Sequence, residues 1–144
     1  MARYHTTVES TRPLEEVFDY LAEFSNARRW DPGVVEGQNV TGMPLGEGTR
    51  FRLVSRFLGR RIPLEYRIIG FERPNRVVFQ ADQSVLRSTD EIRLTATPDG
   101  TSVTYDADLR LKGPVGRLMD PMLALSFRRI GDRAAAGLRA ALNP

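Results

Sequence analysis

The sequence predicts an α+β protein in which a curved antiparallel sheet wraps around a long C-terminal helix. Three observations lead to this prediction: an amphipathic pattern at residues 13–21, a nearly continuous series of β-type segments from position 34 to position 111, and a helical pattern after Pro114. Consecutive strands with short connections form an antiparallel meander, and its apolar face has to be covered by another element. We therefore expect the long helix to lie across the concave face of the sheet.

The first predicted elements are a strand and two short helices. Residues 3–9 alternate in polarity and predict the strand. In residues 13–21, apolar side chains recur at i, i+3, i+4 and i+7, and two glutamates stand in the first turn, where the helix dipole favours carboxylates. The apolar positions are Leu14, Val17, Phe18 and Leu21. A second short helix at residues 24–30 should stop at Asp31, because Pro32 disfavours helical geometry in the residue before it.

Six further strands are predicted by alternation and by β-branched and aromatic residues. They cover residues 34–40, 49–58, 62–70, 76–81, 86–97 and 102–111. Glycine or proline stands at most of the breaks between them, and the Asp99-Gly100 pair is typical of a tight hairpin turn.

The pattern becomes helical after Gly113-Pro114, where a short turn is predicted to precede a long helix at residues 121–142, with Asp120 as its N-cap and Pro121 at its first helical position. A broad apolar stripe along it should cover the sheet. The stripe consists of Met122, Leu123, Ser126, Phe127, Ile130, Ala134, Leu138 and Ala141. Burial against the sheet is expected for Met122, Phe127 and Ile130. Exposure to water is expected for Arg128, Asp132 and Arg139.

Composition is typical of a small protein with one core. The 144 residues, of which 41% are hydrophobic and 27% charged, predict a single domain over residues 1–144. The absence of cysteine excludes disulfides and thiolate chemistry. No apolar run is long enough to span a bilayer or to act as a signal peptide, so we expect a cytoplasmic protein, either a monomer or a homodimer.

The net charge of +3 does not indicate a nucleic-acid partner. Arginine doublets occur in three separate segments, each interleaved with acids. The doublets are Arg28-Arg29, Arg60-Arg61 and Arg128-Arg129, and the acids include Asp31, Glu65 and Asp132. We expect these residues to form a solvated surface, and we predict no nucleic-acid partner.

The expected fold predicts a cavity. An antiparallel sheet bent around a helix leaves apolar inner faces that need not meet, and alternation along each strand decides which side chains point there. The candidate ligand-binding residues are Trp30, Phe51, Leu53, Ser55, Phe57, Tyr66, Phe79, Tyr105, Met119, Met122, Leu123 and Phe127. Trp30 could stack on a ligand at the cavity mouth, or it could be the apolar plug that anchors the second helix.

One carboxylate is a candidate for chemistry inside this cavity. The parity of Ile92 places Asp90 and Ser88 on the inner face, together with Tyr66 and Tyr105. Asp90, Tyr66 and Tyr105 are therefore the candidate catalytic residues. A β-bulge before Ile92 would instead turn Asp90 outward, to an exposed position without a catalytic role.

Histidine chemistry is excluded by the sequence. His5 is the single histidine and has no carboxylate at a helical spacing, so neither a histidine-based triad nor a histidine-rich metal site can form. We expect His5 at the surface, and we predict no metal and no cofactor.

Several short motifs, in their order and spacing, resemble the SRPBCC superfamily of START and Bet v 1-like domains, and most closely its polyketide cyclase/dehydrase-type branch. The motifs are Pro13-x-Glu15-x-Val17-Phe18, Trp30-Asp31-Pro32, Gly46-x-Gly48-Thr49-x-Phe51, Pro98-Asp99-Gly100-Thr101-x-Val103 and Gly113-Pro114. The resemblance covers essentially the whole chain and implies the helix-grip fold, with two short helices after the first strand. It says little about substrate, because members bind or transform very different apolar molecules.

Two functions remain open. The first is binding of a hydrophobic small molecule, such as a lipid, a polyketide-like compound or an aromatic compound, in the cavity between the sheet and the C-terminal helix. The second is a polyketide cyclase or dehydratase-type enzyme in which Asp90 and the tyrosines perform acid–base chemistry. A third possibility, a partner-binding domain as in other branches of the superfamily, would need an exposed apolar or basic patch.

Overall fold

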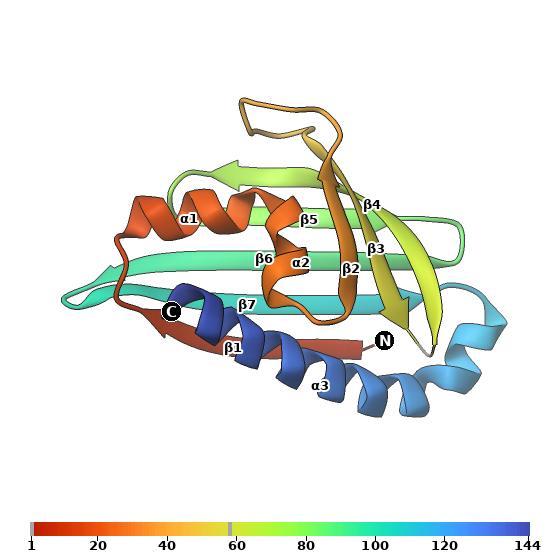
Figure 1. Cartoon of the computed structure of the whole chain (residues 1–144). Coiled ribbons are helices and arrows are strands. Elements are labelled where there is room, and N and C mark those ends of the chain that lie inside the picture. Colours follow the sequence, from red (N-terminus) through yellow and green to blue (C-terminus); the bar gives the residue numbers. More distant parts are fainter. Residues whose placement is uncertain (1, 58) are drawn as a thin grey trace.

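The chain folds into a curled seven-stranded antiparallel sheet with all its helices on one face, in a computed structural model that describes residues 2–57 and 59–144, excluding the side chains of 115–120 (Figure 1). The elements in chain order are β1 (Ala2–Ser10), α1 (Leu14–Ala22), the 3₁₀ helix η1 (Phe24–Asn26), α2 (Ala27–Trp30), β2 (Val34–Asn39), β3 (Arg50–Phe57), β4 (Arg60–Glu72), β5 (Arg76–Asp82), β6 (Leu86–Thr97), β7 (Gly100–Leu111) and α3 (Pro114–Leu142). The predicted α+β class and the order of its elements are confirmed. The predicted end of the third strand, Leu58, lies outside the described residues.

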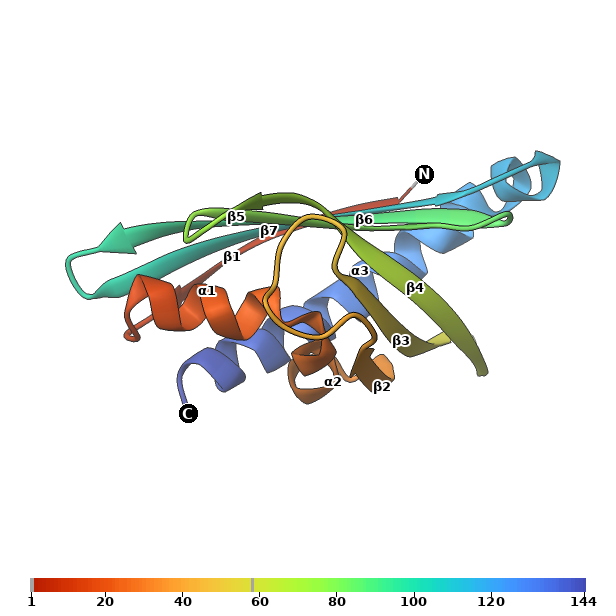
Figure 2. The ribbon, with the colours of Figure 1, turned by 90° about the horizontal axis from the view of Figure 1, so that it is seen from above.

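The sheet is an open meander to which the first strand of the chain is added at one edge. Its strand order is β1-β7-β6-β5-β4-β3-β2, so strands β2 to β7 each pair with their neighbours in sequence, and β1 returns to pair with β7. A register shift between Ile68 and Gly70 interrupts the pairing of β4 with β5, and such irregularities bend a strand and increase its twist. Figure 2 shows β3 and β4 curling toward the side on which the helices lie.

The predicted short turn and the long helix after it form one continuous helix, α3. It starts at Pro114, directly after Gly113, whose φ of 84° lies in the left-handed region that favours glycine, and it continues through Pro121. The predicted N-cap at Asp120 is therefore wrong. Proline lacks the N–H for one helical hydrogen bond, but a long helix whose later turns pack on the sheet can accept that loss with a local bend.

The buried stripe of α3 is narrower than the sequence predicts. Met122 is 70% exposed, so its predicted burial is wrong, while Phe127 and Ile130 are half-buried and face the sheet. The buried row passes from Leu123 through Phe127 to Leu138, and Met122 lies beside that row, on the solvent side. The predicted exposure is confirmed for Arg128, Asp132 and Arg139.

Two glycines allow α3 to lie directly against its neighbours. A methyl group at Gly131 would overlap the ring of Tyr4 on β1, and one at Gly137 would overlap the backbone carbonyl of Trp30 at the end of α2. The hydroxyl of Tyr4 also donates a hydrogen bond to Asp132 at 2.7 Å. These contacts fix the helix to the sheet edge and to α2 at the same time.

A packed aromatic cluster fills the end of the concave face under α1 and η1. The ring of Phe24 stacks on Phe79 with 3.9 Å between centroids, and its edge contacts involve Phe51 and Tyr66. Phe18 of α1 adds a further apolar side chain with no exposed surface. Packed aromatic side chains therefore occupy this end of the concave face.

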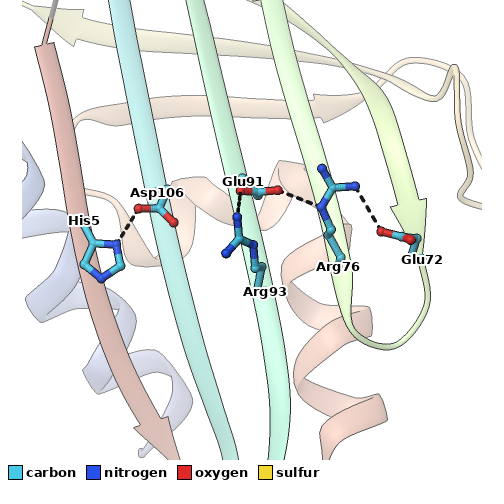
Figure 3. Close-up of polar contacts among 6 residues, drawn as sticks. All are labelled: His5, Glu72, Arg76, Glu91, Arg93 and Asp106. Atoms are coloured by element: carbon cyan, nitrogen blue, oxygen red, sulfur yellow. Dashed lines mark hydrogen bonds and ion pairs between the residues drawn. The ribbon is translucent and has the colours of Figure 1, made fainter.

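The convex face of the sheet carries a row of charged pairs and has no helix over it (Figure 3). Arg76 and Arg93 both bind Glu91 at 2.7 Å, and His5 contacts Asp106 of the neighbouring strand at 2.5 Å. His5 is exposed, as the sequence predicts, although its carboxylate partner comes from sheet pairing that no local spacing reveals. None of the helices in the described part of the chain is long and apolar enough to cross a membrane.

Candidate functional site

A cavity of about 200 Å³ lies between the concave face of the sheet and α3. Its wall is mostly apolar and is built from strands β1, β3, β4, β6 and β7, from α3, and from the segment that follows α2. The apolar part of the wall includes Trp30, Phe57, Ile62, Leu64, Leu86, Ala107, Leu109, Leu111, Phe127, Ile130, Ala134, Ala135 and Leu138. The polar part includes Asp31, Ser55, Tyr66, Ser88, Asp90 and Tyr105.

Strand alternation places these side chains as the sequence predicts. Every second residue of β4, from Ile62 through Leu64 to Tyr66, reaches the cavity, and β7 contributes Tyr105 and Ala107 in the same way. Among the candidate ligand-binding residues, half line the cavity. They are Trp30, Ser55, Phe57, Tyr66, Tyr105 and Phe127.

The remaining candidates lie elsewhere. Phe51, Leu53 and Phe79 share the inner face but belong to the packed core, because η1 inserts Phe24 between the sheet and the helices there. Leu123 is buried outside the cavity wall, and Met122 is exposed. The side chain of Met119 lies outside the described residues. The sequence pattern identifies the inner face, but it does not show where along that face the core ends and the cavity begins.

The polar side chains form a hydrogen-bonded corner around Asp90. No bulge interrupts the pairing of β6 with β5 or β7, so Asp90 points inward, and the predicted alternative of an outward Asp90 is wrong. The hydroxyl of Tyr105 donates to the Asp90 carboxylate, and Ser88 forms a second side-chain hydrogen bond with it. Ser88 is itself 2.9 Å from the hydroxyl of Tyr66, which extends the network across β5 to β4.

Burial has the largest effect on the pKa values of the titratable side chains in this corner. The pKa of Asp90 is raised to about 6, because the raising effects of burial and of the nearby Asp31 charge outweigh the lowering effects of the hydrogen bonds from Tyr105 and Ser88. Burial also raises the pKa of Tyr66 and of Tyr105 above their usual range, and the charge of Asp90 is the second cause of this increase. At neutral pH the tyrosines are therefore hydroxyl donors, and Asp90 changes its charge state close to neutrality.

Asp31 is a second carboxylate on the same wall, and the sequence-based interpretation of it as a surface acid is wrong. It directly follows Trp30 at the end of α2, and its side chain turns inward to accept the backbone N–H of Gly33 at 2.8 Å. Burial raises the pKa of Asp31 to about 6, against the lowering effect of that hydrogen bond. Its position between a buried tryptophan and Pro32 is the one sequence signal that could have placed it inside.

Trp30 combines the two roles that the sequence leaves open. It is only 5% exposed and packs at the end of α2 against α3, as a plug would. Its ring also lines the cavity and contacts the ring of Tyr105 edge-on, with 5.6 Å between centroids. Across the described residues, no three acidic or histidine side chains come close enough together to hold a metal ion.

Solved structures with the same fold come from several bacteria. A START superfamily protein from Mycobacterium smegmatis superposes with a TM-score of 0.72 at 16% identity, covering 99% of this chain and 97% of its own. A protein from Thermus thermophilus gives a TM-score of 0.77 at 17% identity, with coverage of 98% and 95%. The di-domain ARO/CYC protein BexL from the BE-7585A biosynthetic pathway gives 0.68 at 15% identity, over 97% of this chain and 49% of its own.

These similarities show a START and Bet v 1-type fold. No curated protein matches the sequence at a significant level. A family model described as polyketide cyclase / dehydrase and lipid transport matches residues 1–143. The chain therefore belongs to the polyketide cyclase/dehydrase and lipid transport family.

Proposed function

We propose that this protein binds a hydrophobic small molecule in the cavity between the sheet and α3. The observation that supports this most directly is the cavity itself, which has an apolar wall with one polar corner and lies beside the buried aromatic cluster around Phe24. Small-molecule sites are typically concave, mostly apolar, and equipped with a few polar groups that orient the ligand. Family membership supports the same ligand-binding role.

The dimensions of the cavity favour a compact ligand. Its volume of about 200 Å³ is below the roughly 300–1,000 Å³ of typical drug-binding pockets. A ligand with one or two fused rings, or a short branched chain, fits that space better than a full-length lipid. Burying about 150 Å² of such a ligand's apolar surface would contribute roughly 4 kcal/mol before the costs of association.

Filling the cavity tests this proposal. In Ala134→Leu, a larger side chain enters the cavity from α3, whereas Ala136→Leu makes the same change at an exposed position of that helix. The probe is 1-naphthol, an uncharged dye of two fused rings, followed by its fluorescence. We expect Ala134→Leu to weaken binding by tenfold or more and Ala136→Leu to leave it within twofold.

A second filling variant, Ala107→Leu, approaches the cavity from β7 and keeps the test informative if Ala134→Leu unfolds. Thermal unfolding of each variant establishes that it is folded. Equal dye affinity in the native protein and in a folded cavity-filling variant would contradict binding at this site, and so would the absence of any dye binding.

The hydrogen-bonded Asp90 supports a second candidate function, an acid–base enzyme of the cyclase or dehydratase type. A carboxylate with a pKa near neutrality can remove a proton from the carbon beside a carbonyl group. The protonated Asp90 can then return that proton to a departing hydroxyl, which leaves as water, so the residue ends the cycle as it began. Tyr66 and Tyr105 would hold Asp90 in position, directly or through Ser88.

Substitution of Asp90 separates the two functions. If the protein is an enzyme, Asp90→Asn should reduce turnover of a cyclisable or dehydratable carbonyl compound by about 10²- to 10⁴-fold while dye binding is largely kept. If the protein only binds its ligand, no turnover above the uncatalysed rate should be found in the native protein. Ser55→Ala is the matched control, because it removes a different polar group from the same wall.

A further inference from the structure

Two carboxylates lie in the polar corner of the cavity, and no cation among the described side chains pairs with either of them. Asp31 accepts a backbone N–H from Gly33, and Asp90 is hydrogen-bonded by the hydroxyls of Tyr105 and Ser88. None of these partners carries a positive charge. Among the lining residues that the structure describes, the one basic side chain belongs to Arg56, an exposed residue of β3.

The two carboxylates lie at the same end of the cavity. Trp30, the residue before Asp31, contacts the ring of Tyr105, and Tyr105 is the residue that binds Asp90. The charge of Asp31 also acts on Asp90 strongly enough to raise its pKa. Their contacts thus bring the end of α2 and the middle of β6 to one corner.

The described partners of Asp31 and Asp90 leave the two negative charges without a compensating positive charge. Both carboxylates are half-buried, so their like charges repel each other more than they would in bulk water, and neutral hydrogen bonds compensate only part of the cost of burying them. A cation between them would be attracted by both. The faces and edges of Trp30 and Tyr105 line the same corner, and aromatic rings beside carboxylates favour an ammonium group further.

We propose that the ligand of this cavity carries a protonated amine on a compact apolar body, with the ammonium group between Asp31 and Asp90. The apolar body then lies against the wall formed by strands β4 and β7 and by α3. This inference rests on the proposed binding function and names its substrate class. The same two carboxylates would repel a ligand whose polar group is a carboxylate or a phosphate.

Three probes of one shape test the inference. They are 1-adamantanemethylamine, 1-adamantanemethanol and 1-adamantanecarboxylic acid, with the corresponding cyclohexyl compounds as a smaller series. None of them absorbs where tryptophan does, so the emission of Trp30, the single tryptophan of the chain, reports binding directly. At pH 8 both carboxylates are ionised, because each pKa is about 6, and the amine is protonated.

We expect the amine to bind at least tenfold more tightly than the alcohol, and the acid more weakly than either, since hydrogen bonds to charged groups are about twice as strong as neutral ones. Asp31→Asn and Asp90→Asn should each reduce the affinity for the amine by roughly tenfold and leave the affinity for the alcohol within twofold. Asp99→Asn removes a carboxylate at an exposed turn outside the cavity wall, and it should change neither affinity by more than twofold.

Equal binding of amine and alcohol in the native protein would overturn the inference and leave cavity binding intact, and this comparison needs no variant to fold. An Asp→Asn effect of equal size on amine and alcohol would also overturn it. If the uncharged dye binds but neither amine does, the amine assignment is again wrong. If neither the dye nor any compound of the two series binds, the proposed binding function itself fails.

Discussion

The backbone carbonyl of Trp30 occupies the space that a side chain at position 137 would need. Gly137 therefore lets α3 touch the end of α2 without an intervening side chain. Because Trp30 lines the cavity and Asp31 follows it directly, this contact fixes the distance between the helix and the polar corner. The shape of the site depends on a residue that contributes no side chain to it.

Gly137→Ala should destabilise the protein strongly. The added methyl group would meet backbone, which cannot rotate away, so we expect a loss of about 3 kcal/mol or more in the free energy of unfolding. Gly46→Ala is the control, because a methyl group there has no neighbour within 4 Å. Urea unfolding of both variants measures the difference, and similar midpoints would show that α3 can shift without cost.

Phe79→Ala should impair folding much more than ligand binding. The ring of Phe79 is fully buried and stacks on Phe24 outside the cavity, so its removal should cost about 3 to 5 kcal/mol. Phe57→Ala, at the cavity wall, should cost less stability, because Phe57 is only half-buried, but should weaken binding of the uncharged dye. Urea unfolding and dye titration of the two variants measure stability and binding. If Phe79→Ala weakened dye binding more than Phe57→Ala and cost less stability, Phe79 would belong to the cavity wall rather than to the core.

Asp90→Asn should stabilise the protein at pH 8. A carboxylate has an ordinary pKa near 4, so between pH 4 and about 6 the folded state with Asp90 binds more protons than the unfolded state, and stability decreases as the pH rises through this window. The groups facing Asp90 are Asp31, Tyr66, Ser88 and Tyr105. Removing the charge should increase the free energy of unfolding by roughly 1 to 3 kcal/mol at pH 8 and change it little at pH 4.

The control for this prediction is Asp99→Asn, at an exposed turn. Unfolding by urea at several pH values measures the effect. A gain in Asp90→Asn that is the same at pH 4 and pH 8 would show that it does not come from the buried charge.

Tyr105→Phe should raise the pKa of Asp90 above that in the native protein. The Tyr105 hydroxyl stabilises the charged carboxylate, and phenylalanine keeps the ring contact with Trp30 but cannot donate. Carboxyl carbon chemical shifts, followed by NMR as the pH is changed, report this pKa directly. Tyr20→Phe on α1 should leave it unchanged, and an unchanged value in Tyr105→Phe would remove Tyr105 from the network.

The sequence predicts the fold well because its signals are local. Alternation along β4 and β7 correctly identifies the inner face, and turn residues such as Asp99-Gly100 mark the hairpins. The continuity of α3 is missed because the Asp120-Pro121 pair has the composition of a helix start, whereas packing on the sheet keeps the helix continuous through it. At these two residues the local sequence favours a break in the helix, but the packing of α3 on the sheet favours a continuous helix and outweighs that preference.

The site is predicted less completely, because it depends on contacts between distant segments. Asp90 follows from strand parity, but Asp31 is brought inside only by the docking of α2 against α3. Phe79 has the same parity as the cavity residues and is nevertheless part of the core, since the ring that covers it comes from η1. No periodicity within one element carries that information.

The pairing of β1 with β7 also has a consequence for the order of folding. Strands β6 and β7 are joined by a two-residue loop and can form a hairpin early, whereas β1 finds β7 across most of the length of the chain. We expect Val103→Ala in β7 to slow folding and Val8→Ala in β1 mainly to accelerate unfolding, as stopped-flow kinetics would show. Since Tyr4 and Thr6 of β1 form part of the cavity wall, the binding site would then be completed only in the last step of folding.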